Sequence, residues 1–234
     1  MTGDHGFNDA ANGGLLGATE LPAVEIINRD GRSPLLLIGD HAGNLVPHAL
    51  GTLGLDAADL ERPIAWDIGV AALGRLLAET LDAPFVAQRY SRLVIDCNRD
   101  PLSPEALLHE SDGIYIPAND GLDPVNWQKR VAAIHIPYQH AIREEIVQRS
   151  AQHVATTLIS LHSFAPAIDG EERPWHIGVL HNGGNDRFAV RLLDRLRQSD
   201  GLIVGDNQPY PLDSTDHTVP RHAFPKLAYA ELEI

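Results

Sequence analysis

The stretch Pro34-Leu35-Leu36-Leu37-Ile38 is a short continuous apolar run, and the polar cluster Gly39-Asp40-His41-Ala42-Gly43-Asn44 follows it directly. An uninterrupted apolar run between turn-forming residues is typical of a strand that is buried on both faces of a sheet. In sheets of parallel strands covered by helices, ligands bind beyond the carboxyl ends of the strands. The run therefore predicts a central strand and, directly after it, a place where functional residues lie.

Apolar runs alternate with amphipathic segments along the rest of the chain. Further strands are predicted at residues 84–88, 92–97, 155–161, 175–181, 202–204 and 227–234, and helices at residues 67–81, 124–149 and 186–198. Pro137 lies inside the second helix and is expected to kink or split it, because proline cannot donate a backbone hydrogen bond. The alternation predicts an α/β fold, a single domain with a mixed or parallel central sheet flanked by helices on both faces.

Three regions lack this periodicity. Residues 1–20 are rich in Gly, Asn, Asp and Ala, which predicts a flexible leader before a catalytic domain at residues 21–234. Residues 101–124 are rich in Pro, Gly, Ser and Asp, and a connection of that length is more often a functional loop than an idle one. Residues 207–225 are predicted to form another loop.

The composition restricts the classes of partner. The chain has 18 basic and 32 acidic residues, a net charge of −14, and no basic stripe, so binding to nucleic acid or to a membrane surface is not expected. The single cysteine, Cys97, excludes an intramolecular disulfide. The start of the chain does not resemble a signal peptide, and no apolar run approaches the roughly 18 residues that cross a membrane. These features favour a cytoplasmic enzyme, a monomer or a small homo-oligomer.

Two histidines and one aspartate lie at the ends of predicted elements. His41 follows the first strand, His162 closes the strand at 155–161, and Asp67 begins a helix. Two imidazoles and one carboxylate are the protein's share of a catalytic zinc site that keeps a fourth position open for water. Zinc would lower the pKa of that water and polarise a scissile carbonyl. The alternatives are hydrogen-bonded loop histidines and an N-cap role for Asp67.

Arginine and asparagine side chains are the candidate substrate contacts. Arg92 and Arg99 bracket the predicted strand at 92–97, and Arg173 follows His162 in the sequence. A guanidinium binds a carboxylate through two hydrogen bonds, so these residues could anchor an anionic substrate, although solvated charges and salt bridges are the alternatives. Asn98 could contact substrate or orient the arginines. Asn207, in Asn-Gln-Pro-Tyr, could contact substrate or fix a turn.

The common nucleotide and serine-nucleophile motifs are missing from the sequence. It contains no Gly-x-Ser-x-Gly, no Gly-x-x-x-x-Gly-Lys and no Gly-x-Gly-x-x-Gly. A serine hydrolase with a nucleophile elbow, a nucleotide hydrolase with a phosphate-binding loop and a dinucleotide oxidoreductase are therefore disfavoured.

Seven motifs, in order, resemble those of the N-formylglutamate amidohydrolase family. They are His41-Ala-Gly-Asn-Leu-Val-Pro47, Trp66-Asp-Ile-Gly69, Tyr90-Ser-Arg-Leu-Val-Ile-Asp-Cys-Asn-Arg99, His162-Ser-Phe164, Arg173-Pro-Trp-His-Ile-Gly-Val-Leu180, Asp206-Asn-Gln-Pro-Tyr210 and Ala230-Glu-Leu-Glu-Ile234. The motifs extend over nearly all of the chain from about Pro34 onward. The resemblance implies a fold related to the zinc carboxypeptidases.

The resemblance also implies the roles of individual residues. His41, Asp67 and His162 would bind Zn²⁺ or another divalent metal, and Glu233 would be the general base, with Glu231 as the alternative. Side chains two apart on a strand share one side, so both glutamates face the same way. The implied reaction is hydrolysis of a small anionic N-acyl amino acid, N-formyl-L-glutamate, to formate and glutamate. Alternatives are another N-acyl amino acid or peptide as substrate, or a non-catalytic protein that binds acidic metabolites.

Overall fold

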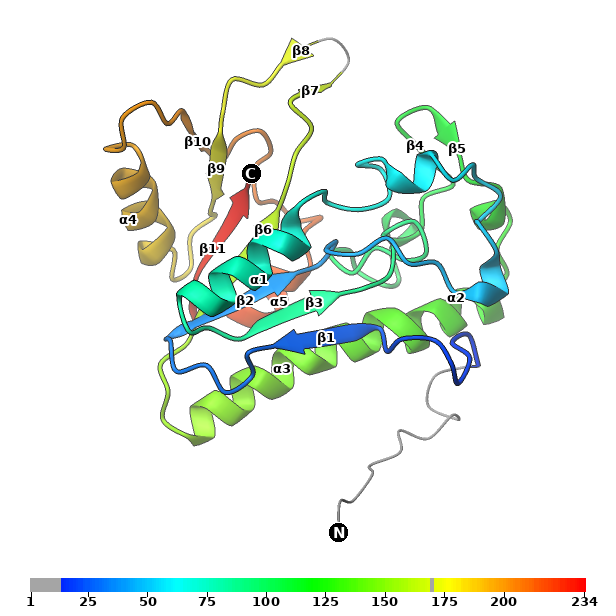
Figure 1. The fold of residues 1–234 in the computed structure, drawn as a ribbon, viewed down its shortest axis with the longest axis horizontal. Helices are drawn as coiled ribbons and strands as arrows, with labels where there is room; N and C mark the ends of the chain where they lie inside the picture. The colour runs from blue at the N-terminus through cyan, green and yellow to red at the C-terminus, as the bar shows by residue number, and fades with distance from the viewer. Residues whose placement is uncertain (1–13, 169–170) are drawn as a thin grey trace.

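The computed structural model describes residues 14–168 and 171–234, and seven of the strands in these residues form one mixed sheet (Figure 1). The strand order is β1-β3-β2-β6-β11-β9-β10. Strands β3, β2, β6 and β11 run parallel to one another, β1 and β9 run antiparallel to their inner neighbours, and β10 is parallel to β9. The strands span Val24–Ile27 (β1), Leu35–Gly39 (β2), Phe85–Gln88 (β3), Thr157–His162 (β6), Ile177–Leu180 (β9), Val204–Asp206 (β10) and Ala228–Glu233 (β11).

Helices cover both faces of this sheet, as predicted (Figure 1). On the first face, called the α3 face, α3 (Ile136–Ala151) and α5 (Thr218–Ala223) pack against side chains such as Leu36 of β2. On the second, the α1 face, α1 (Val70–Thr80) and α4 (Arg187–Leu196) pack against side chains such as Leu37. Successive strand residues alternate between the faces, which explains why an unbroken apolar run forms β2.

The long helix predicted at 124–149 is divided, as Pro137 indicated. It consists of α2 (Pro124–Arg130), one π-helical turn (η6, Val131–His135) and α3, and Pro137 lies in the first turn of α3. Proline has no backbone N–H to donate, and Pro137 lies where the hydrogen-bond pattern changes from the π-helical turn to α3. Asp123 caps α2 by accepting hydrogen bonds from the first backbone N–H groups.

The prediction of a strand at 92–97 is wrong. The Arg92–Cys97 segment is a buried turn, because its backbone bonds to other loops instead of to a neighbouring strand. The Val94 N–H donates to the Ser91 carbonyl, and the Asp96 N–H donates to the Ala106 carbonyl at 2.8 Å. The apolar side chains of this turn still enter the core. A buried turn and a buried strand can both give a short apolar run in the sequence, although only the strand hydrogen-bonds to a neighbouring strand. No strand was predicted at residues 24–27, which form the short edge strand β1.

The loop predicted at 101–124 contains short elements. They are η4 (Pro104–Ala106), β4 (Glu110–Ser111), β5 (Ile114–Tyr115) and η5 (Pro117–Asn119). The buried guanidinium of Arg130 donates to the carbonyls of Val94 and Ala118 and, at 2.6 Å, to the side chain of Asn119. Because a buried donor is costly to leave unpaired, Arg130 ties this loop to the core.

Other connections also carry structure. The predicted loop at 207–225 contains α5, and the remaining short elements are η2 (His48–Leu50), η3 (Asp59–Glu61) and the hairpin of β7 (Ala167–Ile168) and β8 (Glu171–Glu172). Residues 1–13 of the predicted leader lie outside the described residues. Leu15, within the predicted leader, is buried in the core of the α3 face.

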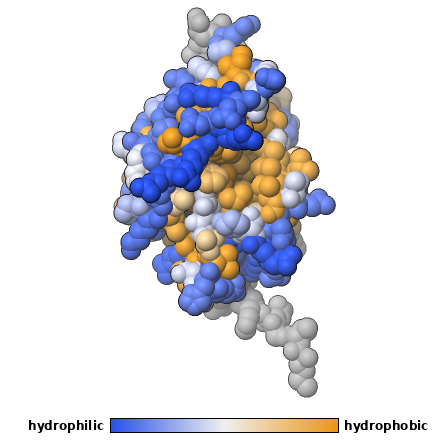
Figure 2. All heavy atoms as spheres, turned by 90° about the vertical axis from the view of Figure 1, so that its left-hand side faces the viewer, coloured by the Kyte–Doolittle hydropathy of each residue, from blue (hydrophilic) through white to orange (hydrophobic). Residues whose placement is uncertain are grey.

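The surface mixes polar and apolar side chains. On the side that faces left in Figure 1, hydrophilic residues surround smaller hydrophobic areas (Figure 2). Among residues 14–168 and 171–234, no helix combines the length and apolar character that a membrane crossing requires.

Candidate active site

Polar side chains occupy the carboxyl-terminal end of the α3 face, where β2, β6 and β11 lie side by side. Ser160 of β6 is in register with Glu231 of β11, and His162 is in register with Glu233. These four side chains lie on one face because residues two apart on a strand point the same way. Each strand is therefore apolar where it packs on α3 and α5 and polar at its carboxyl-terminal end.

His41, Asp67 and His162 meet at these carboxyl-terminal strand ends. One ligand atom from each residue lies within 4.8 Å of the other two, and the three residues are at most 4% exposed. His162 Nδ1 is 2.9 Å and His41 Nδ1 is 3.6 Å from the same oxygen, Asp67 Oδ2. Residues far apart in the sequence thus form one compact group.

Backbone contacts bring Asp67 to this position. Its N–H donates to the carbonyl of His41 at 2.9 Å, and its carboxylate accepts from the Ser163 N–H at 3.3 Å. Asp67 does not cap α1, whose N-cap is Gly69 with a left-handed φ of 90°. The carboxylate is therefore directed at the two histidines, and the N-cap alternative is excluded.

His41 is held in a form that can bind a cation. Its Nε2 lies 2.7 Å from Asp96 Oδ1, whereas its Nδ1 is buried and has no hydrogen-bond partner. Burial and the nearby charge of Arg92 lower the pKa of His41 to about 4, despite the opposing effect of Asp96. An uncharged ring with its hydrogen on Nε2, toward Asp96, directs the Nδ1 lone pair at Asp67.

His162 has a similar arrangement with a different charge. Its Nε2 lies 3.4 Å from Asp40 Oδ2 and 3.1 Å from Ser160 Oγ. Burial disfavours the protonated ring, but the hydrogen bond to Asp40 and the charges of Glu231 and Asp40 outweigh burial and raise the pKa to about 9. A cation at Nδ1 would replace that proton, because a ligating imidazole nitrogen must be deprotonated.

These residues fit a divalent cation. Both Nδ1 atoms face Asp67 Oδ2, and the far nitrogen of each ring faces a carboxylate, Asp96 for His41 and Asp40 for His162. Metal-binding histidines usually have such a carboxylate partner, which fixes the orientation and tautomer of the ring. The unpartnered Nδ1 of His41 is the atom that a cation would satisfy.

Glu231 and Glu233 are buried beside this group, and one oxygen of each carboxyl has no hydrogen-bond partner. Burial raises the pKa of Glu231 to about 8 and also raises the pKa of Glu233. The charges of Arg92 and Arg173 partly counter the shift at Glu233. Glu233 is the nearer of the two to the end of β11, in register with His162.

The three candidate arginines have different partners. Arg92 donates to Asp67 Oδ1, and Arg99 lies 3.4 Å from Asp216 Oδ1. The guanidinium of Arg173 stacks on two aromatic rings, 5.7 Å from the centroid of Phe164 and 4.7 Å from that of Tyr210. The charges of Arg92 and Arg173 both favour the ionised form of Glu233 and so lower its pKa.

Asn98 is engaged within the protein. Its Oδ1 accepts from the N–H groups of His217 and Thr218, and its Nδ2 donates to Asp216 at 3.0 Å. Since the side-chain amide bonds to the start of α5 and to Asp216, the geometry favours the positioning alternative.

Asn207 also makes contacts that fix the backbone. It has a left-handed φ of 52°, and its Oδ1 accepts from the His181 N–H at 2.8 Å, at the end of the sheet remote from His162. The chain then turns back over Gly178, where a Cβ would lie 1.8 Å from the Gln208 carbonyl oxygen. This return brings Tyr210 to Arg173.

Sequence reasoning placed Asp40 in the polar cluster after the first strand without giving it a role, and it gave no role to Ser160 or Thr218. Ser160 lies two residues before His162 on one strand, so the period of two was a usable signal for it. Thr218 reaches Asp40 from α5, 178 residues further along the chain, and no local pattern marks that contact.

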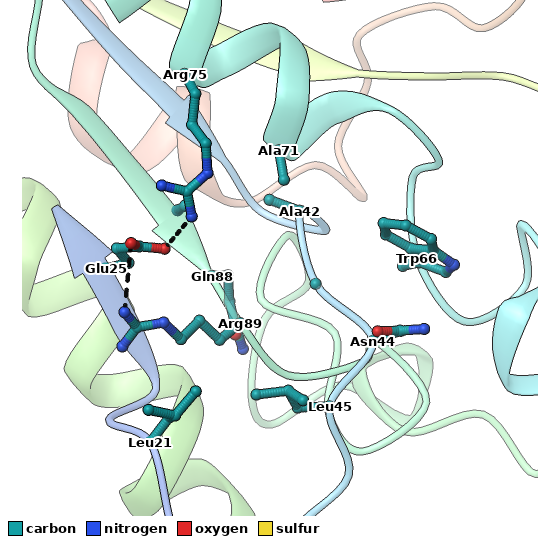
Figure 3. A pocket seen from close by; sticks show the side chains of 12 residues that line it. Leu21, Glu25, Ala42, Asn44, Leu45, Trp66, Ala71, Arg75, Gln88 and Arg89 are labelled. Carbon is teal, nitrogen blue, oxygen red and sulfur yellow. Dashed lines mark hydrogen bonds and ion pairs between the residues drawn. The ribbon is translucent and has the colours of Figure 1, made fainter. Parts of the chain in front are cut away.

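A surface cavity of about 380 Å³ lies near the site but on the α1 side of the sheet (Figure 3). It is lined partly by Arg75 of α1 and by Trp66, and Glu25 bridges Arg75 at 2.5 Å and Arg89 at 3.5 Å. Both guanidinium groups are thus paired with Glu25. The cavity is separate from the His–Asp–His group, which lies on the α3 side.

The fold and this buried group define an α/β protein with a cluster of polar residues at the carboxyl ends of its parallel strands. A sequence model described as N-formylglutamate amidohydrolase matches residues 33–234. The chain belongs to the N-formylglutamate amidohydrolase family, and the resemblance seen in its motifs is confirmed.

Similar solved structures include the following two. The gene product Atu2144 from Agrobacterium tumefaciens is 35% identical with a TM-score of 0.88, over 94% of this chain and 87% of that chain. The N-formylglutamate amidohydrolase from Ralstonia eutropha JMP134 is 20% identical with a TM-score of 0.68, over 92% of this chain and 86% of that chain, and this likeness concerns the fold. Among curated proteins, none matches the chain.

Proposed function

We propose that this protein is a metal-dependent amidohydrolase that converts N-formyl-L-glutamate to formate and glutamate. The observation that carries the proposal is the meeting of His41, Asp67 and His162, with a carboxylate behind each imidazole. Family membership and the name of the Ralstonia structure support the substrate. Residues from 21 onward would then form one catalytic domain.

When bound to this group, Zn²⁺ or another divalent cation would polarise the formyl carbonyl and lower the pKa of the attacking water. Glu233 accepts the proton of that water and passes it to the leaving nitrogen, because its side chain points to the same side as His162. Burial raises the pKa of Glu233, which makes its carboxylate a stronger proton acceptor. Glu231, two residues earlier on β11 and in register with Ser160, is the alternative base.

The substrate's carboxylates bind to the arginines of the site. Arg99 and Arg173 are each partly exposed, and Arg92 contacts the His–Asp–His group directly through Asp67. In a chain of net charge −14, these guanidinium groups supply the local positive charge that an anionic substrate needs. Asn98 positions the start of α5 beside the site and Asn207 fixes the turn that leads to Tyr210, so neither is assigned a substrate contact.

Replacing Arg99 by Ala is expected to raise KM for N-formylglutamate by about 10- to 100-fold with a smaller change in kcat. A hydrogen bond to a charged group contributes about 1.5–3 kcal/mol, and about 1.4 kcal/mol corresponds to a factor of ten. Steady-state formate release measures both constants. Arg195→Ala, on the exposed side of α4, is the matched control and should leave KM unchanged. An unchanged KM in Arg99→Ala would remove Arg99 from the substrate site.

A panel of N-acyl amino acids and short peptides, assayed for released amine, tests the substrate assignment. N-formylglutamate is expected to give the highest kcat/KM. If another compound is hydrolysed faster, that compound is the substrate and the proposed reaction is otherwise unchanged. Residues 101–124 would then be the segment that determines substrate specificity. Ligand-induced thermal stabilisation without turnover at any metal loading would indicate a binding protein and contradict the proposed reaction.

A further inference from the structure

Asp40 is the acceptor on which several buried donors converge. Its carboxylate accepts from Ser160 Oγ at 3.2 Å and from the hydroxyl of Thr218, and it lies 3.4 Å from His162 Nε2. The residue is 2% exposed. A carboxylate removed from water is tolerated only when hydrogen bonds satisfy it, and these three neighbours supply the hydrogen bonds that the buried Asp40 carboxylate requires.

The hydrogen bonds continue from Asp40 across the α3 face. Gln139 of α3 donates from Nε2 to Thr218 Oγ1 at 3.1 Å and to the Cys97 carbonyl at 2.8 Å. Its Oε1 lies 2.7 Å from Nε2 of His222, on α5. Gln139, Thr218 and Asp40 therefore form a chain of buried groups from two helices to the end of β2.

The direction of this chain is fixed by its chemistry. Gln139 donates its amide hydrogen to Thr218 Oγ1, and the hydroxyl hydrogen of Thr218 is then available for Asp40, which can only accept when ionised. An ionised Asp40 favours a hydrogen on Nε2 of His162. The neutral form of that ring then carries its lone pair on Nδ1, the nitrogen that faces Asp67.

We infer that Gln139, Thr218 and Asp40 are positioning residues that select the tautomer and orientation of His162 required for metal binding. The inference rests on the proposed function, because these residues would prepare His162 to bind the divalent cation proposed for the His–Asp–His group. It also gives α5 a function, because α5 supplies the hydroxyl that Asp40 accepts.

A pair of substitutions at Thr218 tests this inference. Thr218→Val keeps the shape of the side chain and removes the hydroxyl, whereas Thr218→Ser keeps the hydroxyl. We expect Thr218→Val to weaken Zn²⁺ binding by about tenfold, the lower end of the roughly 10- to 100-fold range for residues that hold a ligand in place. Thr218→Ser should bind Zn²⁺ with an affinity close to that of the unmodified chain. Competition with a chromophoric chelator measures both dissociation constants.

The outcomes separate this inference from the proposed function. Equal Zn²⁺ affinity in folded Thr218→Val and the unmodified chain would overturn the inference alone, and so would equal loss of affinity in Thr218→Ser. Failure of the unmodified chain to bind Zn²⁺ or any other divalent cation would overturn both. If Thr218→Val does not fold, Asp40→Asn replaces it, with an expected loss of about 10- to 100-fold in Zn²⁺ affinity. Unchanged affinity in Asp40→Asn would also contradict the inference.

Discussion

His162→Ala is expected to lose bound metal and turnover together. His162 would supply one of three ligands, and its Nδ1 lies 2.9 Å from the shared oxygen of Asp67. Removing a ligand should weaken metal binding by more than the roughly 10- to 100-fold that is typical of changes in the surrounding shell. Metal content after dialysis and the rate of formate release measure the two losses.

His140→Ala is the matched control, because this histidine lies on α3 with an exposed side chain. It should retain both metal and activity, which shows that loss of an imidazole as such has no effect. Retention of both metal and rate in His162→Ala would remove His162 from the site. Loss of rate with full metal content would assign His162 to a step other than metal binding.

Glu233→Gln is expected to keep the metal and lose turnover by about 10²- to 10⁴-fold, the usual contribution of a general acid–base residue. The amide has nearly the shape of the carboxyl group but cannot accept the proton. Metal analysis and single-turnover formate release measure the two quantities separately.

Glu231→Gln is the matched comparison on the same strand. Burial raises the pKa of Glu231 to about 8, so its carboxyl is mostly neutral at pH 7 and an amide imitates it closely. The loss of rate in Glu231→Gln should therefore be much smaller. A larger loss in Glu231→Gln than in Glu233→Gln would exchange the roles of the two residues.

The sequence predicted the type of fold because long apolar runs and amphipathic periods are local features. The run at 34–38 and the helix broken near Pro137 both have the predicted structure. The turn at 92–97 does not, because Leu93, Val94 and Ile95 are buried against loops, and burial alone does not distinguish a strand from a packed turn. The edge strand β1 has only partly buried residues and too weak a pattern to detect.

The candidate metal ligands could be predicted because each lies in a motif at the end of an element. The residues behind them were harder to predict, since Asp40 and Thr218 meet only when α5 packs on β6 and β11. The same applies to Asn98 and Asn207. Their residue types suit substrate contacts, but their hydrogen bonds to the backbone of distant segments exist only in the folded chain.

Metal titration of the chelator-stripped protein, with formate release measured at each step, tests the metal site most directly. One equivalent of Zn²⁺ per chain is predicted to bind, and hydrolysis of N-formylglutamate is predicted to rise in proportion to occupancy. Full activity in the stripped protein, or Zn²⁺ binding that is unaffected by His41→Ala, Asp67→Ala and His162→Ala, would contradict a cation held by these three residues.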